Sequence, residues 1–304
     1  MKIGIIRNNV IATVSVRLDS KFHLSDGIYS KSRILGSPYL IKKVGDVTKN
    51  IFYGNRAKRI YVNDVKKGVP FISSSDMLKS DFSGIKHISK KYSQTLSSLL
   101  LEKDWILISR SGTIGNTVYT NELFQNKAGS EHIIRVVPNN EIYSGYLYSY
   151  LSSKFGYTLL TQGTFGAVIQ HIEPEHIKNL PVPIFPESKQ QEIHNLIVES
   201  ANLRVEANRL LEEAQNKITS QLGFEKNKIS KRVSITDILM AHQMRFESQY
   251  YKSIGSYYRS EILNLNHIFL KDISENIFRP GIFKRNYIIV YHTLFIYTVI
   301  SVVY

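Results

Sequence analysis

The chain has 304 residues, and its 39 lysines and arginines against 25 aspartates and glutamates give a formal net charge of +14 at pH 7. It contains no cysteine, which excludes disulfide scaffolds, zinc ribbons, iron–sulfur sites and cysteine nucleophiles. Because 43% of the residues are hydrophobic, a disordered polycation is excluded as well. The positive excess favours a polyanionic partner, either nucleic acid or an anionic membrane surface. The first ten residues show no signal-peptide pattern, so we expect a cytoplasmic protein.

Residues 1–186 are expected to form one domain, and they hold most of the charge excess, +11. Short apolar runs of strand length occur at 70–72, 105–108 and 132–137, and turn signals separate them. A helix-like stretch ends near residue 153, and a proline-punctuated run closes the domain at 180–186. This mixture of strand and helix signals predicts the α/β (mixed α+β) fold class.

A loop of small residues, Ser109–Asn116, follows the second of these runs directly. Its glycines, Gly112 and Gly115, permit a close approach of backbone amides to a phosphate, and Arg110 has donors for a guanine edge or a phosphate oxygen. The motif is not a P-loop, because no Gly-Lys-Ser/Thr follows. A plain tight turn explains the same residues equally well, so both interpretations stay open.

Residues 187–222 are predicted to form one long helical spacer, because no glycine or proline occurs in them and Pro186 and Gly223 mark its two ends. Apolar and small residues recur in steps of three and four, which is typical of a coiled-coil seam. An ordinary amphipathic helix packed on its own domain is the alternative, but the length and the narrow seam favour a protruding coiled coil. The helix-pairing residues of this seam are Ile193, Leu196, Ser200, Leu203, Ala207, Leu210 and Ala214.

The segment after the spacer repeats the beginning of the chain. Residues 10–35 align with residues 238–263 at a shift of 228, and after a two-residue deletion 46–52 align with 272–278. Such a period is too long for a solenoid and indicates a tandem repeat of a whole domain. Residues 223–288 are therefore expected to form a linker and the N-terminal part of a second α/β domain.

The correspondence ends near residue 288, and an apolar tail, residues 289–304, follows it. Two full copies at this period need roughly 450 residues, so our hypothesis is an abrupt, out-of-frame end that replaces the rest of the second copy. A short membrane anchor at 288–304 is the alternative, and it makes the chain a basic membrane-associated protein.

Five motifs in order, PFISSSDM, ILISRSGTIGNT, HIIRVVPN, GTFGAVIQHI and LPVPIFPESKQQEI, lead into the long helix. With them the chain resembles the specificity subunit of type I restriction-modification systems, truncated in its second target recognition domain. The resemblance covers nearly all of residues 1–288. It implies two target recognition domains separated by a helical spacer, with a second helix after the second domain that pairs antiparallel with the spacer.

By the same resemblance, each recognition domain reads one half of a split sequence in double-stranded DNA and presents it to methyltransferase subunits and, through them, to restriction subunits. S-adenosylmethionine and ATP with magnesium are then expected only in those partner subunits, and no cofactor in this chain. Because most of the second domain and the second helix are missing, a second copy of the chain is expected to supply the partner helix, which predicts a homodimer and a palindromic split target. A decayed, inactive remnant is the alternative.

The candidate DNA-binding residues fall into two groups. A basic cluster, Arg56, Lys58 and Arg59, is expected to position phosphates, and Lys284 and Arg285 repeat it in the second copy. Lys90, Lys91 and Tyr92 are interpreted as a solvated edge, with phosphate contact as the alternative. The candidates for reading bases are polar or flexible loop residues: Ser73, Ser74, Arg110, Gly112, Asn116, Thr164 and Gln170.

Catalysis is not expected of this chain. An adenine methyltransferase needs an Asn/Asp-Pro-Pro-aromatic motif, and none occurs. Glu102-Lys103-Asp104 is the only dense group for a nuclease, and we interpret it as a turn. Glu173 and His176 have the spacing of a metal pair, but they flank Pro174 in a loop-like context, so no metal site is predicted.

Overall fold

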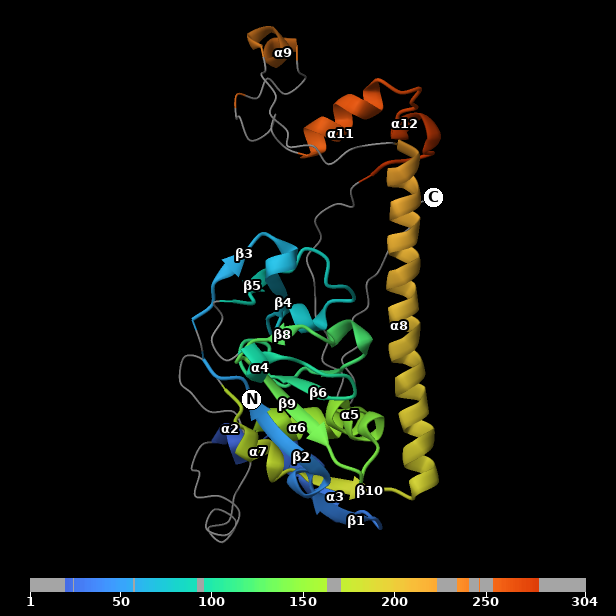
Figure 1. The fold of residues 1–304 in the computed structure, drawn as a ribbon. Coiled ribbons are helices and arrows are strands. Elements are labelled where there is room, and N and C mark those ends of the chain that lie inside the picture. Colours follow the sequence, from blue (N-terminus) through green and yellow to red (C-terminus); the bar gives the residue numbers. More distant parts are fainter. Residues whose placement is uncertain are drawn as a thin grey trace. The chain divides into compact units, whose positions relative to one another are not determined.

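The computed structural model describes residues 20–23, 25–56, 58–91, 96–162, 171–222, 234–240, 246 and 254–278. The chain divides into two units, Met1–Lys217 and Ile218–Tyr304 (Figure 1). In the first unit the helices (α, or η for a 3-10 turn) and strands (β) follow in the order α2 Ser20–His23, α3 Asp26–Leu35, β1 Leu40–Lys43, η1 Val44–Val47, β2 Thr48–Tyr53, β3 Tyr61–Val62, η2 Val65–Lys67, β4 Gly68–Ile72, η3 Asp76–Leu78, β5 His87–Ser89, α4 Leu96–Leu99, β6 Ile106–Ser109, β7 Thr117–Tyr119, η4 Glu122–Phe124, β8 Ala128–Gly129, β9 Ile133–Pro138, α5 Ser144–Ser152, α6 Lys154–Gln162, α7 Pro174–Lys178, β10 Pro181–Ile184 and α8 Glu187–Leu222.

The central sheet of the first unit has the antiparallel order β2-β9-β6-β7. All four residues of β6 are buried, and they alternate between two cores: Ile106 and Ile108 pack with the helical layer, whereas Leu107 packs with Ile72 and Phe124. This alternation follows from the period of two along a strand. A sheet covered on both faces requires continuous apolar strands, which explains why the runs at 105–108 and 132–137 carry so few polar residues.

A second sheet, in the order β3-β5-β4-β8, holds a smaller core and lies beside the central one (Figure 1). Its β4 pairs antiparallel with β5 and parallel with β8, in the register Phe71↔Ala128 and Ile72↔Gly129. A third pairing joins β1 to β10, so that residues 40–43 lie against 181–184. This last pairing ties the start of the domain to the segment that leads directly into α8.

Two tyrosines of α5 fix β10, a strand whose prolines cannot donate ladder hydrogen bonds. The Tyr146 hydroxyl donates to the Pro183 carbonyl over 2.5 Å, and the Tyr150 hydroxyl donates to the Pro181 carbonyl. Both side chains are buried, and burial raises the pKa of both phenols above the ordinary value. Neutral phenols are therefore part of the folded state.

Replacing Tyr150 with phenylalanine is expected to lower the free energy of unfolding by about 1–2 kcal/mol, because the Pro181 carbonyl loses its buried donor. Since the folded-state pKa is raised, this stabilisation is complete below the unfolded pKa of about 10 and is lost as the pH rises further. Urea unfolding, followed by the fluorescence of the only tryptophan, Trp105, measures both effects. The exposed Tyr29→Phe is the control, and an equal loss there argues against the contact.

Helix α8 begins at Glu187, as the sequence predicts, but part of it packs along the domain instead of protruding. Asn121 Nδ2 donates to the Ala201 carbonyl over 3.2 Å, and Asn208 Nδ2 donates to the Ser80 carbonyl over 2.7 Å. Ile193, placed in the seam by its spacing, packs against the main core of the domain. The reason is a second apolar stripe, separate from most of the seam, whose members are half-buried: Ile193, Ile197, Ala201 and Val205.

The described helices of the second unit are α9 Ile235–Met240, α11 Ile254–Leu263 and α12 Leu270–Ile273. A shift of 228 residues takes α3 onto α11 end to end, and a shift of 226 takes η1 onto α12. The boundaries of α11 and α12 therefore follow the sequence repeat. The tail 289–304 lies outside the described residues. In the part of the chain that the structure describes, no helix is both long enough and apolar enough to cross a membrane.

Two sequence interpretations concern segments expected to be a turn or a loop. Asp104 adopts a left-handed backbone with φ of 64° between Glu102 and β6, which agrees with the predicted turn. The loop-like context of Glu173 and His176 is wrong, because α7 begins at Pro174. Proline at the first helical position starts a helix rather than preventing one, and His176 Nε2 lies 2.8 Å from the Leu159 carbonyl.

Candidate nucleic-acid interface

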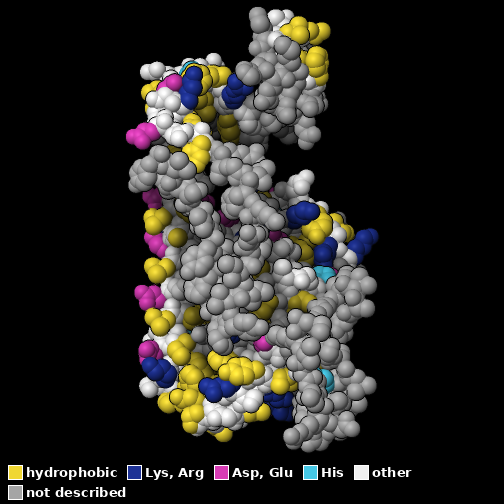
Figure 2. Space-filling model, turned by 180° about the vertical axis from the view of Figure 1, so that it is seen from behind, with side chains coloured by type: hydrophobic (Ala, Val, Ile, Leu, Met, Phe, Trp, Pro, Cys, Tyr) yellow, Lys and Arg dark blue, Asp and Glu magenta, His cyan; other side chains and the backbone are white. Residues whose placement is uncertain are grey.

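A group of exposed lysines surrounds the small sheet, and we call it the basic patch. The pairing of β3 with β5, in the register Tyr61↔Ile88, brings residues from three separate segments together. The Lys90 ammonium donates to the Lys66 carbonyl over 3.2 Å, and the Lys86 ammonium lies 5.4 Å from the ring centre of Tyr61. Figure 2 shows dark blue side chains gathered on this part of the surface. The members of the basic patch are Lys58, Lys66, Lys67, Lys86, Lys90 and Lys91.

One carboxylate partly offsets this positive charge. Asp64 lies 3.7 Å from the Lys67 ammonium, and its side chain also caps η2 by accepting from the Lys66 amide. Arg56 is exposed just before the patch on the connection from β2 to β3. Several lysines around one small sheet raise the local potential for a polyanion, and long flexible side chains suit phosphates at variable spacing.

Arg59, predicted to position phosphates with Arg56 and Lys58, is engaged inside the protein. Its guanidinium forms an ion pair with Glu131 and lies 4.7 Å from the ring centre of Phe71. The side chain is 27% exposed. The predicted basic cluster therefore contains two exposed cations and one that holds segments of the domain together.

The loop Ser109–Asn116 joins β6 to β7 and is organised by its own hydrogen bonds. The Ser109 hydroxyl donates to the Thr113 carbonyl, and Asn116 Nδ2 donates to the same carbonyl over 3.1 Å. Gly112 has φ of 79°, and no atom of the described part of the chain lies within 4 Å of the place where a Cβ would stand. Gly115 has φ of 82°, and a Cβ there would meet Thr161 at 3.0 Å. Both positions favour glycine, and Gly112 and Thr113 at the tip of the loop are exposed.

Arg110, at the base of this loop, is largely buried. Its guanidinium forms an ion pair with Glu173 and lies 4.3 Å from the ring centre of Tyr53, and the side chain is 16% exposed. Its Nε is buried, and no hydrogen-bond partner for it is found among the described residues. Base reading by Arg110 would require release from Glu173, so in this conformation the arginine anchors the loop.

Of the two candidate serines after β4, Ser73 forms hydrogen bonds with Asp76 at the start of η3. Its hydroxyl donates to Asp76 over 2.6 Å, and its amide donates to the same carboxylate over 3.1 Å. Desolvation opposes ionisation of Asp76, but hydrogen bonds from Lys79 and Ser73 hold its pKa below the ordinary value. Ser74 is half-buried next to Ser73. Thr164 and Gln170 lie outside the described residues.

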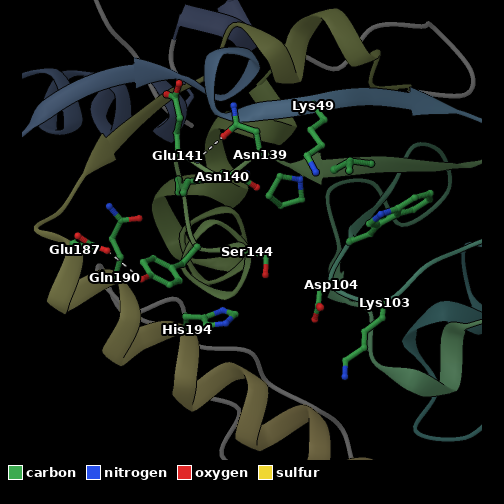
Figure 3. A pocket seen from close by; sticks show the side chains of 15 residues that line it. Lys49, Lys103, Asp104, Asn139, Asn140, Glu141, Ser144, Glu187, Gln190 and His194 are labelled. Carbon is green, nitrogen blue, oxygen red and sulfur yellow. Dashed lines mark hydrogen bonds between the residues drawn. The ribbon is translucent and has the colours of Figure 1, made fainter.

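A polar cleft of about 840 Å³ lies between the end of β9 and the first turns of α8 (Figure 3). His194 Nδ1 accepts from the Gly145 amide over 3.1 Å, and the Tyr143 hydroxyl donates to Glu187 over 3.3 Å. Lys49 and Asp104 also face the cleft (Figure 3). With cations and carboxylates mixed on its walls, this cleft lacks the single sign of charge that a phosphate backbone favours.

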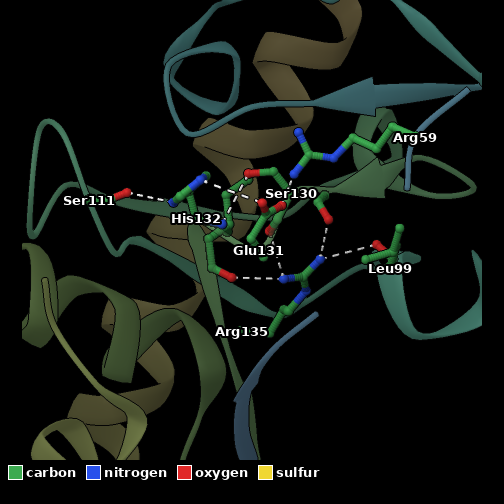
Figure 4. A network of polar contacts seen from close by, with 9 residues as sticks. Arg59, Leu99, Ser111, Ser130, Glu131, His132 and Arg135 are labelled. Carbon is green, nitrogen blue, oxygen red and sulfur yellow. Dashed lines mark hydrogen bonds and ion pairs between the residues drawn. The ribbon is translucent and has the colours of Figure 1, made fainter. Parts of the chain in front are cut away.

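Behind the interface, Arg135 is fully buried in β9 and donates to four backbone carbonyls (Figure 4). Nη1 donates to Ser130 over 3.1 Å and to Ile133 over 2.7 Å, and Nη2 donates to Leu99 over 3.2 Å and to Gly129 over 2.6 Å. Burial lowers the pKa of Arg135 to about 10, and the Glu131 carboxylate opposes that shift. The guanidinium thereby fixes the turn from β8 to β9.

The sequence interpretation named Lys58, Lys90 and Lys91 but missed the other half of the basic patch. Lys66, Lys67 and Lys86 are dispersed in the sequence, and only the pairing of β3, β4 and β5 brings them beside Lys90. The one available signal was the density of lysines between residues 58 and 91, which a solvated surface explains equally well. Among the described residues, no three His, Asp or Glu side chains are grouped to hold a metal ion.

Comparison with known families matches residues 38–213 to the model described as the type I restriction modification DNA specificity domain. That match covers more than half of the chain. The chain belongs to this family. The specificity domain thus contains the basic patch, the β6–β7 loop and most of α8, and the family and fold class predicted from the sequence are confirmed.

Solved structures of low similarity include an S subunit of a type I restriction-modification system and an HsdS subunit. The S subunit from M. genitalium is 16% identical with a TM-score of 0.43, and the match covers 62% of this chain and 45% of that one. The HsdS subunit from Thermoanaerobacter tengcongensis is 14% identical with a TM-score of 0.41, covering 60% and 45%. The matches thus span less than half of either solved chain. Comparison with curated proteins gives no match.

Proposed function

We propose that this specificity domain recognises a DNA sequence and directs the methyltransferase and restriction subunits of a type I restriction-modification system to it. The basic patch is the observation that carries the proposal, because it presents exposed lysines of three segments on one surface of a DNA specificity domain. Phosphate contacts of this kind position a duplex without reading its sequence. Base reading is assigned to the open loop tip around Gly112, with Ser74 and Asn116 as neighbouring candidates.

In this proposal the chain itself performs no chemistry. S-adenosylmethionine and ATP with magnesium belong to the partner subunits, and the chain supplies recognition only. Residues 1–186 form one target recognition domain, residues 187–222 form the spacer, and residues 223–288 form a linker and the beginning of a second recognition domain. The coincidence of α3 with α11, and of η1 with α12, supports that division.

Selection from a pool of random duplexes tests the proposal with the purified full chain. We expect enrichment of a short sequence, bound at least about a thousandfold more tightly than random duplex. Co-expression with the methyltransferase subunit and mapping of genomic methylation then identifies the target in cells. Binding without any enriched sequence, or enrichment of single-stranded over double-stranded DNA, contradicts the proposal.

The outward face of α8 supports pairing with another helix. Three leucines of the seam are exposed, Leu196 at 61%, Leu203 at 63% and Leu210 at 50%. Glutamates repeat every seven residues between them, and yellow and magenta side chains alternate along this edge in Figure 2. We call this surface the acidic strip, with the members Glu192, Leu196, Glu199, Leu203, Glu206, Leu210 and Glu213.

Charge decides which helix suits the acidic strip. Glu192, Glu206 and Glu213 each have a cation on α8 itself within 3.2 Å, whereas no ion pair is found for Glu199 among the described residues. A second copy brings acidic strips together, while a helix with lysine or arginine opposite Glu199 complements the strip. A partner helix with basic flanking residues is therefore favoured over the homodimer, which stays the alternative.

Replacing Leu203 with glutamate is expected to abolish this helix pairing, because it adds a charge to the centre of the apolar seam. Sedimentation of the chain at micromolar concentration, by itself and mixed with the methyltransferase subunit, measures whether the complex forms. We expect loss of the complex with unchanged fluorescence of Trp105, which lies on the recognition domain. The exposed Leu78→Glu on η3 is the control, and an equal loss with it argues against the strip.

A further inference from the structure

A chain of polar contacts links the basic patch to the β6–β7 loop (Figure 4). Arg59, next to Lys58 of the patch, pairs with Glu131. The other oxygen of Glu131 lies 3.6 Å from His132 Nε2, and His132 Nδ1 lies 2.7 Å from the Ser111 hydroxyl. Ser111 is buried near the base of the loop, where its backbone forms an isolated bridge with His171. Three segments that are distant in sequence are therefore joined through two side chains, Glu131 and His132.

Two members of this chain of contacts are buried. The Glu131 side chain is 10% exposed and Ser111 is 8% exposed, whereas the His132 side chain between them is 36% exposed. Water therefore competes little at Glu131 and Ser111 but reaches part of the imidazole. His132 Nδ1 is within hydrogen-bond distance of the Ser111 hydroxyl, whereas the 3.6 Å between Nε2 and the Glu131 carboxylate is longer than a hydrogen bond. The contact with Ser111 is therefore the one that orients the ring.

The backbone beside His132 is fixed independently. Arg135 holds the carbonyls of Gly129, Ser130 and Ile133, and the Arg110 amide donates to the His132 carbonyl over 2.9 Å. The base of the loop is thereby held whether or not the imidazole is present. The side chain of His132 adds a contact to the Ser111 hydroxyl, and the Ser111 backbone forms a bridge with His171.

We propose that His132 is a positioning residue, which sets the β6–β7 loop relative to the basic patch through Ser111. The proposal rests on the proposed function, in which the loop reads bases and the patch holds phosphates. Hydrogen bonds to base edges demand an accurate placement of the loop, whereas lysine–phosphate contacts tolerate displacement. Removal of the His132 side chain therefore costs specific binding and leaves non-specific binding unchanged.

Three substitutions at one position separate the two arms of the imidazole. His132→Ala removes both contacts. His132→Asn places an amide atom where Nδ1 stands and keeps the bond to Ser111, whereas His132→Gln reaches the place of Nε2 and keeps only the Glu131 side. Ser111→Ala is a further variant that leaves His132, Glu131 and Arg59 intact.

The measured quantity is the ratio of affinities of the full chain for its selected duplex and for random duplex. We expect His132→Ala, His132→Gln and Ser111→Ala to lower this ratio by about tenfold, and His132→Asn to restore it to within about twofold of the unmodified chain. A ratio unchanged in His132→Ala, equal rescue by asparagine and glutamine, or an equal fall of both affinities overturns the proposal.

Hydrogen exchange of residues 111–116 without DNA distinguishes this proposal from the proposed function. We expect exchange at least about tenfold faster in His132→Ala and Ser111→Ala, with the amides of β6 and β9 unchanged. If the unmodified chain selects no duplex, the proposed function fails, and the exchange result still decides whether His132 positions the loop. Unchanged exchange of residues 111–116 in these two variants overturns the positioning role of His132, even when the unmodified chain selects a duplex.

Discussion

Replacing Arg135 with alanine is expected to lower the free energy of unfolding of the first unit by about 3–5 kcal/mol. Its guanidinium is the only side chain found to donate to the carbonyls of Leu99, Gly129, Ser130 and Ile133 in the described structure. Alanine leaves these buried acceptors without that donor and opens a cavity in the centre of the sheet. For a domain with an ordinary stability of about 5–15 kcal/mol, this loss is a large part of the total.

Urea unfolding followed by Trp105 fluorescence measures this effect, since the single tryptophan packs edge-on against Phe52 beside the central sheet. A lower midpoint with an unchanged slope is expected. Arg33→Ala, at an exposed position of α3, serves as the control and is expected to change stability by less than about 0.5 kcal/mol. A similar midpoint in both variants shows that Arg135 is dispensable for folding.

Replacing Lys66, Lys86 and Lys90 together with alanine is expected to weaken binding to every duplex by roughly 10- to 100-fold at moderate salt. Each lysine–phosphate interaction contributes about 0.9 to the slope of log K against log salt, so the slope of the triple variant becomes shallower by roughly 2–3. The ratio of specific to random affinity stays nearly constant, because phosphate contacts carry no sequence information directly. Titrations at several salt concentrations measure the slope and the ratio.

The matched control removes the same charge elsewhere. Lys31, Lys178 and Lys189 lie on α3, α7 and α8, and their joint replacement by alanine lowers the net charge equally. This control variant is expected to have a slope of log K against log salt that differs by less than about 1 from the slope of the unmodified chain. If both triple variants lose affinity and slope alike, bulk charge rather than the basic patch is responsible, and the interface lies elsewhere.

Local signals in the sequence predicted several elements closely. The runs at 70–72, 105–108 and 132–137 lie in or across β4, β6 and β9, and the helix expected from Glu187 is α8. Each depends on contacts near in sequence: apolar strand runs, turn residues and a proline before a glycine-free helix. The glycine loop was expected for the same reason, and the positive φ angles of Gly112 and Gly115 agree with it.

The course of α8 was only half predictable. Spacing in steps of three and four identified the exposed seam leucines, but it also placed Ile193 in the seam. Which of two apolar stripes meets the domain depends on the shape of the surface that α8 meets, including Tyr143 and Phe185. That surface forms only when the strands and α5 have packed, so helical periodicity alone could not assign Ile193.

The sequence by itself determined the family, the mixed α/β class, the long helix and the positive charge, because motif order, periodicity and composition are local or additive properties. Only the tertiary structure decided which cations are exposed. Lys66, Lys86 and Lys90 gather because β3, β5 and β4 pair, whereas Arg59 and Arg110 are engaged by Glu131 and Glu173. An arginine has the same charge whether it is exposed or paired inside the protein. Its role depends on whether a carboxylate from a distant segment of the chain lies beside it.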